Sequence, residues 1–189
     1  MRGPLLALLM VVAGGCAQAQ TVAVDEGVAA WERVFDVLSH PRCTNCHVGP
    51  RGVPMWEGLD FGEGKAHGMG IMADESRIGA ESLPCRTCHV TAARRDLASP
   101  APPQIDDAWR LPPVQLEWRG KDKLALCMQF RDPALNDGQK IADIVEHVES
   151  SAFVAWGFAP GRGRLAPQGS VAQLASDLAA WGSAGAPCK

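Results

Sequence analysis

The sequence predicts a mainly α, loop-rich fold, and three observations support that prediction. Apolar residues recur at helical spacing from about residue 28 and again at several places after residue 120. Two long stretches, residues 48–84 and 90–118, are rich in glycine or proline and show little periodicity. A five-residue pattern with two cysteines and a histidine occurs at 43–47 and again at 85–89. No β-hairpin alternation, further repeat or clean linker is visible, so one domain is expected.

Composition excludes two broad classes of protein. The 189 residues carry 18 Lys and Arg against 21 Asp and Glu, which gives a formal net charge of −3. A protein that binds nucleic acid through its phosphates normally has a strong basic excess, so no nucleic-acid partner is expected. At 47% hydrophobic residues the chain is not disordered, yet the absence of Tyr and only 5 Phe leave few large side chains for a core.

Four helices are predicted from apolar spacing. The first ends just before Pro41, because proline interrupts a helix, and its apolar positions are Val28, Trp31, Phe35 and Leu38. The others are predicted at about 121–131, stopped by Pro133, at about 137–150 and at 170–182. The last begins with a capping box of Ser170 and Gln173, and its apolar stripe is Val171, Leu174, Leu178 and Trp181.

Residues 1–19 have the pattern of a secretory signal peptide. Arg2 supplies the positive end, residues 5–13 form the apolar run, and Ala17-Gln18-Ala19 is a small-x-small cleavage site. The run is too short to span a bilayer, so residues 20–189 are expected to form a soluble periplasmic domain. The alternative is a lipoprotein signal that ends before Cys16, and only a lipid on that cysteine would bring the protein to a membrane.

The two repeated motifs are Cys43-Thr44-Asn45-Cys46-His47 and Cys85-Arg86-Thr87-Cys88-His89. Both have the spacing of a c-type haem attachment site. Two thiols on one helical turn can each form a thioether to one porphyrin, and the following histidine can then bind the iron. The sequence therefore predicts two covalently attached c-type haems, with His47 and His89 as proximal ligands, in a cytochrome c-like fold organised around them.

Two other uses of such cysteines were weighed. A redox dithiol does not require a histidine next to it and does not usually occur twice. A zinc site would use all four cysteines, but the 38 residues between Cys46 and Cys85 are about twice the common separation in a zinc ribbon. The doubled histidine and the export signal favour haem.

The haems also account for the unusual loops. Residues 48–84 contain eight glycines and are too long for an ordinary loop in a compact domain. We expect this stretch to be ordered by packing on porphyrin through Met55, Trp56, Phe61 and Ile71. Five prolines exclude a continuous helix in residues 90–118. Two porphyrins and the six Trp residues would supply the large apolar surfaces that the composition lacks.

Each iron needs a sixth ligand or an open position, and three further histidines are available. His67 and His147 are the preferred distal ligands, and His40 is the alternative. His67 lies in a Gly-rich stretch, where a solvated loop histidine is also consistent with the sequence. His147 lies beside the apolar stripe of the 137–150 helix and could instead be a half-buried helix residue. His40 either caps the end of the first helix or reaches the neighbouring haem.

Methionine ligation remains open for either iron. The candidates are Met55, Met69, Met72 and Met128.

Two cysteines, Cys127 and Cys188, are left after haem attachment. In an exported protein such a pair most simply forms a disulfide, and closing a loop of about 60 residues would stabilise the fold by roughly 4 kcal/mol in the loop-entropy model. The alternative is two free buried thiols.

Several segments resemble a family of small exported di-haem proteins of bacteria that carry the label isoquinoline 1-oxidoreductase subunit. They cover nearly the whole mature chain: residues 40–47, 132–133, 136–138, 156–161 and 185–188. The resemblance implies a c-type cytochrome that accepts electrons from a molybdenum hydroxylase. The substrate in the label is not carried over. His40, His67, His147, Cys127 and Cys188 fall at positions that the family pattern also occupies.

Arg110 is a departure from that family, whose members tend to have histidine there. An arginine cannot ligate iron, but it can pair with a haem propionate.

These observations predict an electron-transfer protein rather than an enzyme. It would carry single electrons between an exported dehydrogenase, such as a molybdenum hydroxylase, and a downstream acceptor in the respiratory chain. Its acidic charge favours docking on a basic partner surface. The alternatives are a di-haem peroxidase-like enzyme with one open haem site and a subunit of a polymerising multihaem cytochrome.

Overall fold

The computed structural model describes residues 12–56, 64–73, 75–80, 83–89, 109–161 and 164–189. The protein is mainly helical, which confirms that part of the predicted fold class. Its α-helices are α1 Val12–Leu38, α2 Pro41–Thr44, α3 Lys123–Arg131, α4 Ile141–Ser150, α5 Ala152–Phe158 and α6 Val171–Ser183. The short elements are the 3₁₀ turns η1 Gly68–Gly70, η2 Cys85–Thr87 and η3 Val114–Leu116, and an antiparallel pair of two-residue strands, β1 Gly79–Ala80 and β2 Leu83–Pro84.

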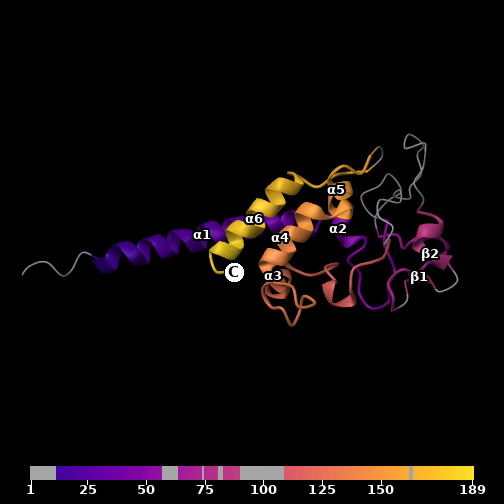
Figure 1. Cartoon of the computed structure of the whole chain (residues 1–189), viewed down its shortest axis with the longest axis horizontal. Helices are drawn as coiled ribbons and strands as arrows, with labels where there is room; N and C mark the ends of the chain where they lie inside the picture. Colours follow the sequence, from indigo (N-terminus) through magenta and orange to yellow (C-terminus); the bar gives the residue numbers. More distant parts are fainter. Residues whose placement is uncertain (1–11, 57–63, 74, 81–82, 90–108, 162–163) are drawn as a thin grey trace, which may run out of the picture.

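The helices gather in one part of the molecule and the short elements in another. Helix α6 packs along α1 and also against α4, while α3 contacts α1. Figure 1 shows the strands β1 and β2 at the far end of the molecule from the start of α1, which projects beyond the other helices. No helix in the described parts of the chain combines the length and apolar character that crossing a membrane requires.

Helix α1 ends where the sequence predicts but begins much earlier. It starts at Val12 rather than near Val28, so it passes through the expected cleavage site at residues 17–19. The signal peptide stays a prediction. The C-terminal end at Leu38 is confirmed, and Pro41 then begins α2 at a first-turn position, where its missing N–H costs nothing.

Two tryptophans form the centre of the helical core. Trp31 of α1 and Trp181 of α6 are each about 1% exposed or less, and their ring centroids lie 4.7 Å apart. Phe130 of α3 lies 5.6 Å from Trp31. Both indole N–H groups are satisfied by backbone carbonyls, Trp31 by Lys123 at 3.2 Å and Trp181 by Pro187 at 3.0 Å. The expectation that tryptophan supplies core surface is therefore confirmed at these two positions.

The predicted helices α3 and α6 lie close to their expected bounds. Asp122 caps α3 by accepting a 2.7 Å hydrogen bond from the Ala125 N–H, and the helix ends before Pro133. At α6 the Ser170 Oγ accepts from the Gln173 N–H at 3.2 Å. The predicted stripe of α6 is buried at Leu174, Leu178 and Trp181 and partly buried at Val171.

Helix α4 begins at Ile141, four residues later than predicted. Asp137 and Gly138 have φ angles of 65° and 79°, and this left-handed backbone cannot belong to a right-handed helix. Helix α5 was not predicted at all. Ser151 ends α4 and also caps α5, by accepting from the Val154 N–H at 3.4 Å, so two helices follow each other without a loop that would mark the boundary.

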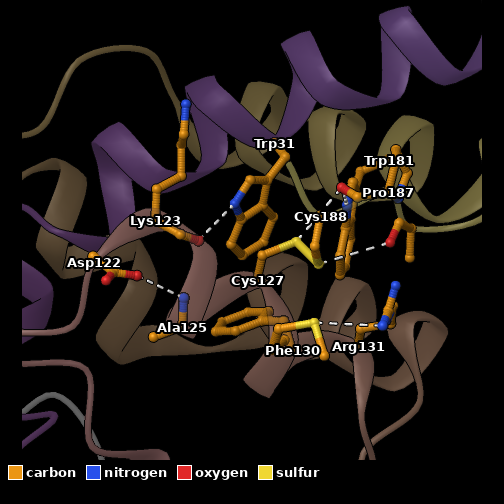
Figure 2. Close-up of a disulfide and its surroundings, with 12 residues drawn as sticks. Trp31, Asp122, Lys123, Ala125, Cys127, Phe130, Arg131, Trp181, Pro187 and Cys188 are labelled. Atoms are coloured by element: carbon orange, nitrogen blue, oxygen red, sulfur yellow. Dashed lines mark hydrogen bonds between the residues drawn. A yellow bond between two sulfur atoms is a disulfide. The ribbon is translucent and has the colours of Figure 1, made fainter.

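The predicted disulfide between Cys127 and Cys188 is confirmed. It joins α3 to the C-terminal tail, with the two Cα atoms 5.7 Å apart and 61 positions apart in sequence. Figure 2 shows it beside Trp31 and Trp181, so the bridge is part of the same core as the two tryptophans.

We expect removal of this bridge to destabilise the helical core. The double variant Cys127→Ala, Cys188→Ala should lower the free energy of unfolding by about 2–5 kcal/mol, because the unfolded chain regains the freedom that the closed loop removes. Urea unfolding followed by circular dichroism measures the change. As a control, a reducing agent should destabilise the parent protein and leave the double variant unaffected. Equal unfolding midpoints for parent and variant without reductant would contradict the prediction.

Candidate functional site

The two cysteine-histidine motifs share one backbone geometry. In the first, which overlaps α2, the His47 N–H donates to the Cys43 carbonyl at 3.1 Å. In the second, which overlaps η2, the His89 N–H donates to the Cys85 carbonyl at 3.0 Å. Each bond closes one helical turn that carries two cysteines and the histidine. In the described structure none of the four cysteines, Cys43, Cys46, Cys85 and Cys88, forms a disulfide.

Burial makes the thiols of the first motif weak acids. It raises the pKa of Cys43 to about 12, with the neighbouring Cys46 adding to the effect and Arg42 opposing it. It also raises the pKa of Cys46 to about 11. A reactive redox cysteine has a lowered pKa instead, because the thiolate is the nucleophile. The electrostatics of this motif therefore oppose a redox dithiol.

His47 is held on three sides by residues 116–119. Its Nδ1 lies 2.9 Å from the Leu116 carbonyl, its own carbonyl accepts from the Trp118 N–H at 3.1 Å, and its ring stacks on Trp118 at 3.3 Å. A carbonyl at Nδ1 fixes the proton there and leaves Nε2 to bind a metal. Burial lowers the pKa of His47 to about 3 against the opposing Leu116 bond, so the ring is neutral, which is the form that ligates metals.

His147 of α4 lies in the neighbourhood of His47. Burial is the main cause of the lowered pKa of His47, and the charge of His147 contributes to it as a smaller cause. His147 itself is exposed on the helix, and partial burial of its ring lowers its pKa. This electrostatic effect relates His47 to one of the two preferred distal candidates.

His89 is buried at 8% exposure in an aromatic setting. Its ring stacks on Trp109 at 4.2 Å, and Phe153 of α5 lies edge-on to Trp109 at 5.2 Å. Trp109 is itself buried, so it fixes one face of the imidazole.

His67 is positioned by pairing of two loop segments. The Trp56 N–H donates to the Lys65 carbonyl at 2.7 Å, and the His67 N–H donates to the Pro54 carbonyl at 2.8 Å. The His67 ring then lies edge-on to Trp56, and its Nδ1 lies 2.8 Å from the Gly68 carbonyl. As at His47, this arrangement leaves Nε2 for a metal. His67 is half-buried and held by these contacts, unlike a fully solvated loop histidine.

The rings of His67 and His89 face a common space. Their centroids are 6.2 Å apart and their planes are inclined by 59°. Two imidazoles on opposite sides of one metal ion, each at about 2.0–2.1 Å from it, have ring centres about 6 Å apart. Rotation about the metal–nitrogen bonds allows any angle between the planes. The spacing therefore suits a single iron between these two rings.

A cavity of about 230 Å³ joins the two motifs. The first motif contributes Cys46, and the second contributes Cys85, Cys88 and His89, with His67 on the wall as well. The rest of the wall is largely apolar and includes Met55, Trp56, Ile71, Leu83, Trp109 and Leu111. Three of the four loop side chains expected to pack on porphyrin are therefore at this cavity, while Phe61 lies outside the described residues.

Two arginines lie beside the same cavity. The guanidinium carbons of Arg42 and Arg164 are 6.0 and 5.8 Å from the ring centre of Trp156, which lines the cavity together with Arg42. Burial, followed by the nearby charge of Arg164, lowers the pKa of Arg42. A pair of guanidinium groups at an apolar cavity is well suited to bind carboxylates, because each can donate two parallel hydrogen bonds.

His40 occupies a capping position, but at the opposite helix end from the one expected. It is the N-cap of α2, and its Nδ1 accepts from the Arg42 N–H at 3.1 Å. The structure thus places this side chain at the N-terminus of α2, whereas a cap at the end of α1 was one of its two expected roles. The α2 backbone turns away from α1 at Pro41, so the side chain meets the free N–H groups of the second helix instead.

The other candidates are more exposed. Met69, Met72 and Met128 are 85%, 55% and 37% exposed, whereas Met55 is partly buried at the cavity. Arg110 is exposed as well.

No family model, curated protein or solved structure matches this chain. Among the described residues, no three His, Cys, Asp or Glu side chains gather closely enough to hold a metal ion by themselves. A haem iron takes only its axial ligands from the protein, so a haem site does not need such a group.

The sequence did not reveal what holds the two proximal histidines. Trp118 lies 71 positions after His47, and Trp109 lies 20 positions after His89, and neither spacing belongs to a known pattern. The available signal was composition: a chain without Tyr uses its few Trp residues at sites that need a large ring.

The capping position of His40 leads to a test of its role. His40→Ala should lower the free energy of unfolding by about 1 kcal/mol. His40→Asn should retain most of the stability of the parent protein, because asparagine is also a good N-cap. The visible spectrum of the haem protein should be that of the parent in both variants. Loss of a low-spin spectrum in both would instead identify His40 as an iron ligand.

The same cap should depend on pH. Burial, followed by the charge of Arg42, lowers the pKa of His40, so the unfolded chain binds the proton at a higher pH than the folded chain. The stabilisation by the His40 cap is therefore complete above the pKa of histidine in the unfolded chain, about 6.5. It is lost as the pH falls through the lower pKa that His40 has in the folded chain. The difference between the parent and His40→Ala in urea unfolding should shrink on acidification.

Proposed function

We propose that this protein is a periplasmic di-haem c-type cytochrome that carries single electrons between redox proteins. The observation that carries the proposal is the repeated geometry of the two motifs. Each places two cysteines outside any disulfide and a histidine on one turn; the ring of His67 lies 6.2 Å from that of His89, and the charge of His147 acts on His47. Haem supplies the one-electron chemistry when bound.

The residues present fit haem at both motifs. The Trp118 Nε1–H is buried without a hydrogen-bond acceptor beside His47, as expected of a donor whose partner belongs to a bound group. Arg42 and Arg164 would hold propionates at the cavity. The apolar wall formed by Trp56, Trp109 and other residues would exclude water from the porphyrin edge.

The geometry favours one assignment of axial ligands. His67 pairs with His89, because their ring spacing suits one iron, and His147 pairs with His47, because α4 brings it into the same region. His40 is assigned to the cap instead. Two histidine ligands on each iron leave no open position for substrate, which supports electron transfer over catalysis.

The partners that this role requires are an electron donor and an electron acceptor. The donor would be an exported dehydrogenase, and the family resemblance favours a molybdenum hydroxylase. Since both motifs border one cavity, the two haems would lie close enough for electrons to pass between them within the protein.

A di-haem peroxidase-like enzyme is the second candidate. It needs one iron whose sixth ligand can be displaced, and the exposure of His147 on α4 is the observation that favours it. In that case the first haem would be the reactive one.

Haem content is the first test. The parent protein, produced in a host with a c-type haem attachment system, should carry two haems, measured by intact mass and by the haemochrome spectrum in pyridine. Two double variants each remove the cysteines of one motif. The variant with Cys43→Ser and Cys46→Ser and the variant with Cys85→Ser and Cys88→Ser should each carry one haem. A parent protein of unmodified mass, or one that binds zinc in place of haem, would overturn the proposal.

The ligand assignment is tested by low-temperature electron paramagnetic resonance on the holoprotein. His67→Ala should convert the haem at the second motif to a high-spin form, and His147→Ala should do the same at the first, because each loses its sixth ligand. His40→Ala serves as the matched control and should leave both haems low-spin. If the protein is peroxidase-like, the parent already shows one high-spin signal and His147→Ala changes little.

A further inference from the structure

Arg77 is a buried cation outside the sites described above. It is 5% exposed and lies two residues before β1. Its φ angle is 62°, in the left-handed region that non-glycine residues rarely adopt. The surrounding structure therefore holds this residue in place against both a desolvation cost and a backbone cost.

Within the described parts of the chain, the guanidinium of Arg77 donates to three backbone carbonyls, which are neutral. Nε bonds the Pro112 carbonyl at 2.8 Å, Nη1 the Gly49 carbonyl at 3.2 Å and Nη2 the Val48 carbonyl at 2.9 Å. Its own carbonyl accepts from the Leu111 N–H at 2.7 Å. These three bonds carry no opposing charge, and an arginine stays protonated in a protein.

The position of the charge relative to the first motif follows from chain connectivity. Val48 and Gly49 are the two residues directly after His47, so the guanidinium lies against the backbone that carries the proximal histidine. The second motif meets the neighbouring backbone instead, where the Ile78 carbonyl accepts from the Cys85 N–H at 2.8 Å.

We infer that Arg77 raises the reduction potential of the iron bound by His47 above that of the iron bound by His89, so that a single electron rests on the first haem. The inference rests on the proposed function. Uptake of one electron lowers the positive charge of a ferric iron by one, so a nearby cation favours the ferrous form. The effect is strong here because buried charges are screened little by water or salt.

Arg42 and Arg164 do not provide the same asymmetry. Arg42 lines the cavity shared by both motifs and Arg164 lies over the Trp156 ring beside it, where haem propionates would offset their charge. Arg77 contacts carbonyls instead. It acts through His47 as a positioning residue that changes the reduction potential of the iron bound there.

The test is a redox titration of the holoprotein. The oxidation state of each haem is monitored by its own electron paramagnetic resonance signal. Arg77→Gln removes the charge, Arg77→Lys keeps it, and Arg131→Gln removes an exposed charge of α3 as the matched control. We expect Arg77→Gln to reduce the preference of the electron for the first haem about tenfold, which is 59 mV for one electron. Arg77→Lys should retain most of the preference, and Arg131→Gln all of it.

Equal shifts at both haems, or unchanged potentials in Arg77→Gln, would overturn the inference. So would an equal effect of Arg77→Lys and Arg77→Gln, because a purely structural residue is disturbed by both. Measuring the haem content shows whether the inference about Arg77 or the proposed function has failed. Two haems with unchanged potentials contradict only the role of Arg77, whereas a protein without haem contradicts the cytochrome itself.

A second measurement needs no variant and applies even where Arg77→Gln does not fold. The difference in potential between the two haems of the parent protein should persist from low to high salt, because a buried charge sets it. A difference that vanishes at high salt would assign it to surface charges and overturn the inference.

Discussion

The contact between Trp31 and Trp181 is the interaction on which the rest of the helical part depends. It joins the first and last helices of the described chain, with Phe130 of α3 and the disulfide packed beside it. Because α1 is fixed by this contact, the place where it ends is fixed too, and α2 with the first motif follows within a few residues. Helix α4 packs on α6 and carries His147 into the region of His47. One aromatic pair thus orders both sides of the first site.

The loop-rich part of the molecule is built in a different way. Among the described residues, its small buried apolar cluster consists of Val48, Ala73 and Leu111, and hydrogen bonds between loop segments do most of the ordering. The pairing of residues 54–56 with 65–67 places His67, and Arg77 ties three carbonyls together. Hydrogen bonds of this kind add little net stability each. A large apolar group in the cavity would add the burial that this half lacks, which explains how a loop-rich chain with few aromatic residues can still be ordered.

Local features of the chain could be predicted from sequence, and non-local ones could not. The ends of α1 and α3 follow from proline, the cap at Ser170 follows from its neighbours, and the two motifs follow from spacing alone. The start of α4 was missed because the left-handed backbone at Asp137 is a property of the folded turn. Two ring contacts depend on how irregular loops pack, and no periodicity in the sequence predicts them. They are the contact of His67 with His89 and that of His47 with Trp118.

Burial is the common cause of the chemical properties of the first motif. It keeps the thiols of Cys43 and Cys46 protonated and the imidazole of His47 neutral. The imidazole of His47 adds no charge, so the charged groups beside this backbone are the Arg77 guanidinium and the Glu117 carboxylate, which lies against Gly49. The same low-dielectric surroundings that make this cation costly also carry its field to the imidazole with little screening. A guanidinium bonded to the two carbonyls that follow His47 would make two similar motifs electrically unequal.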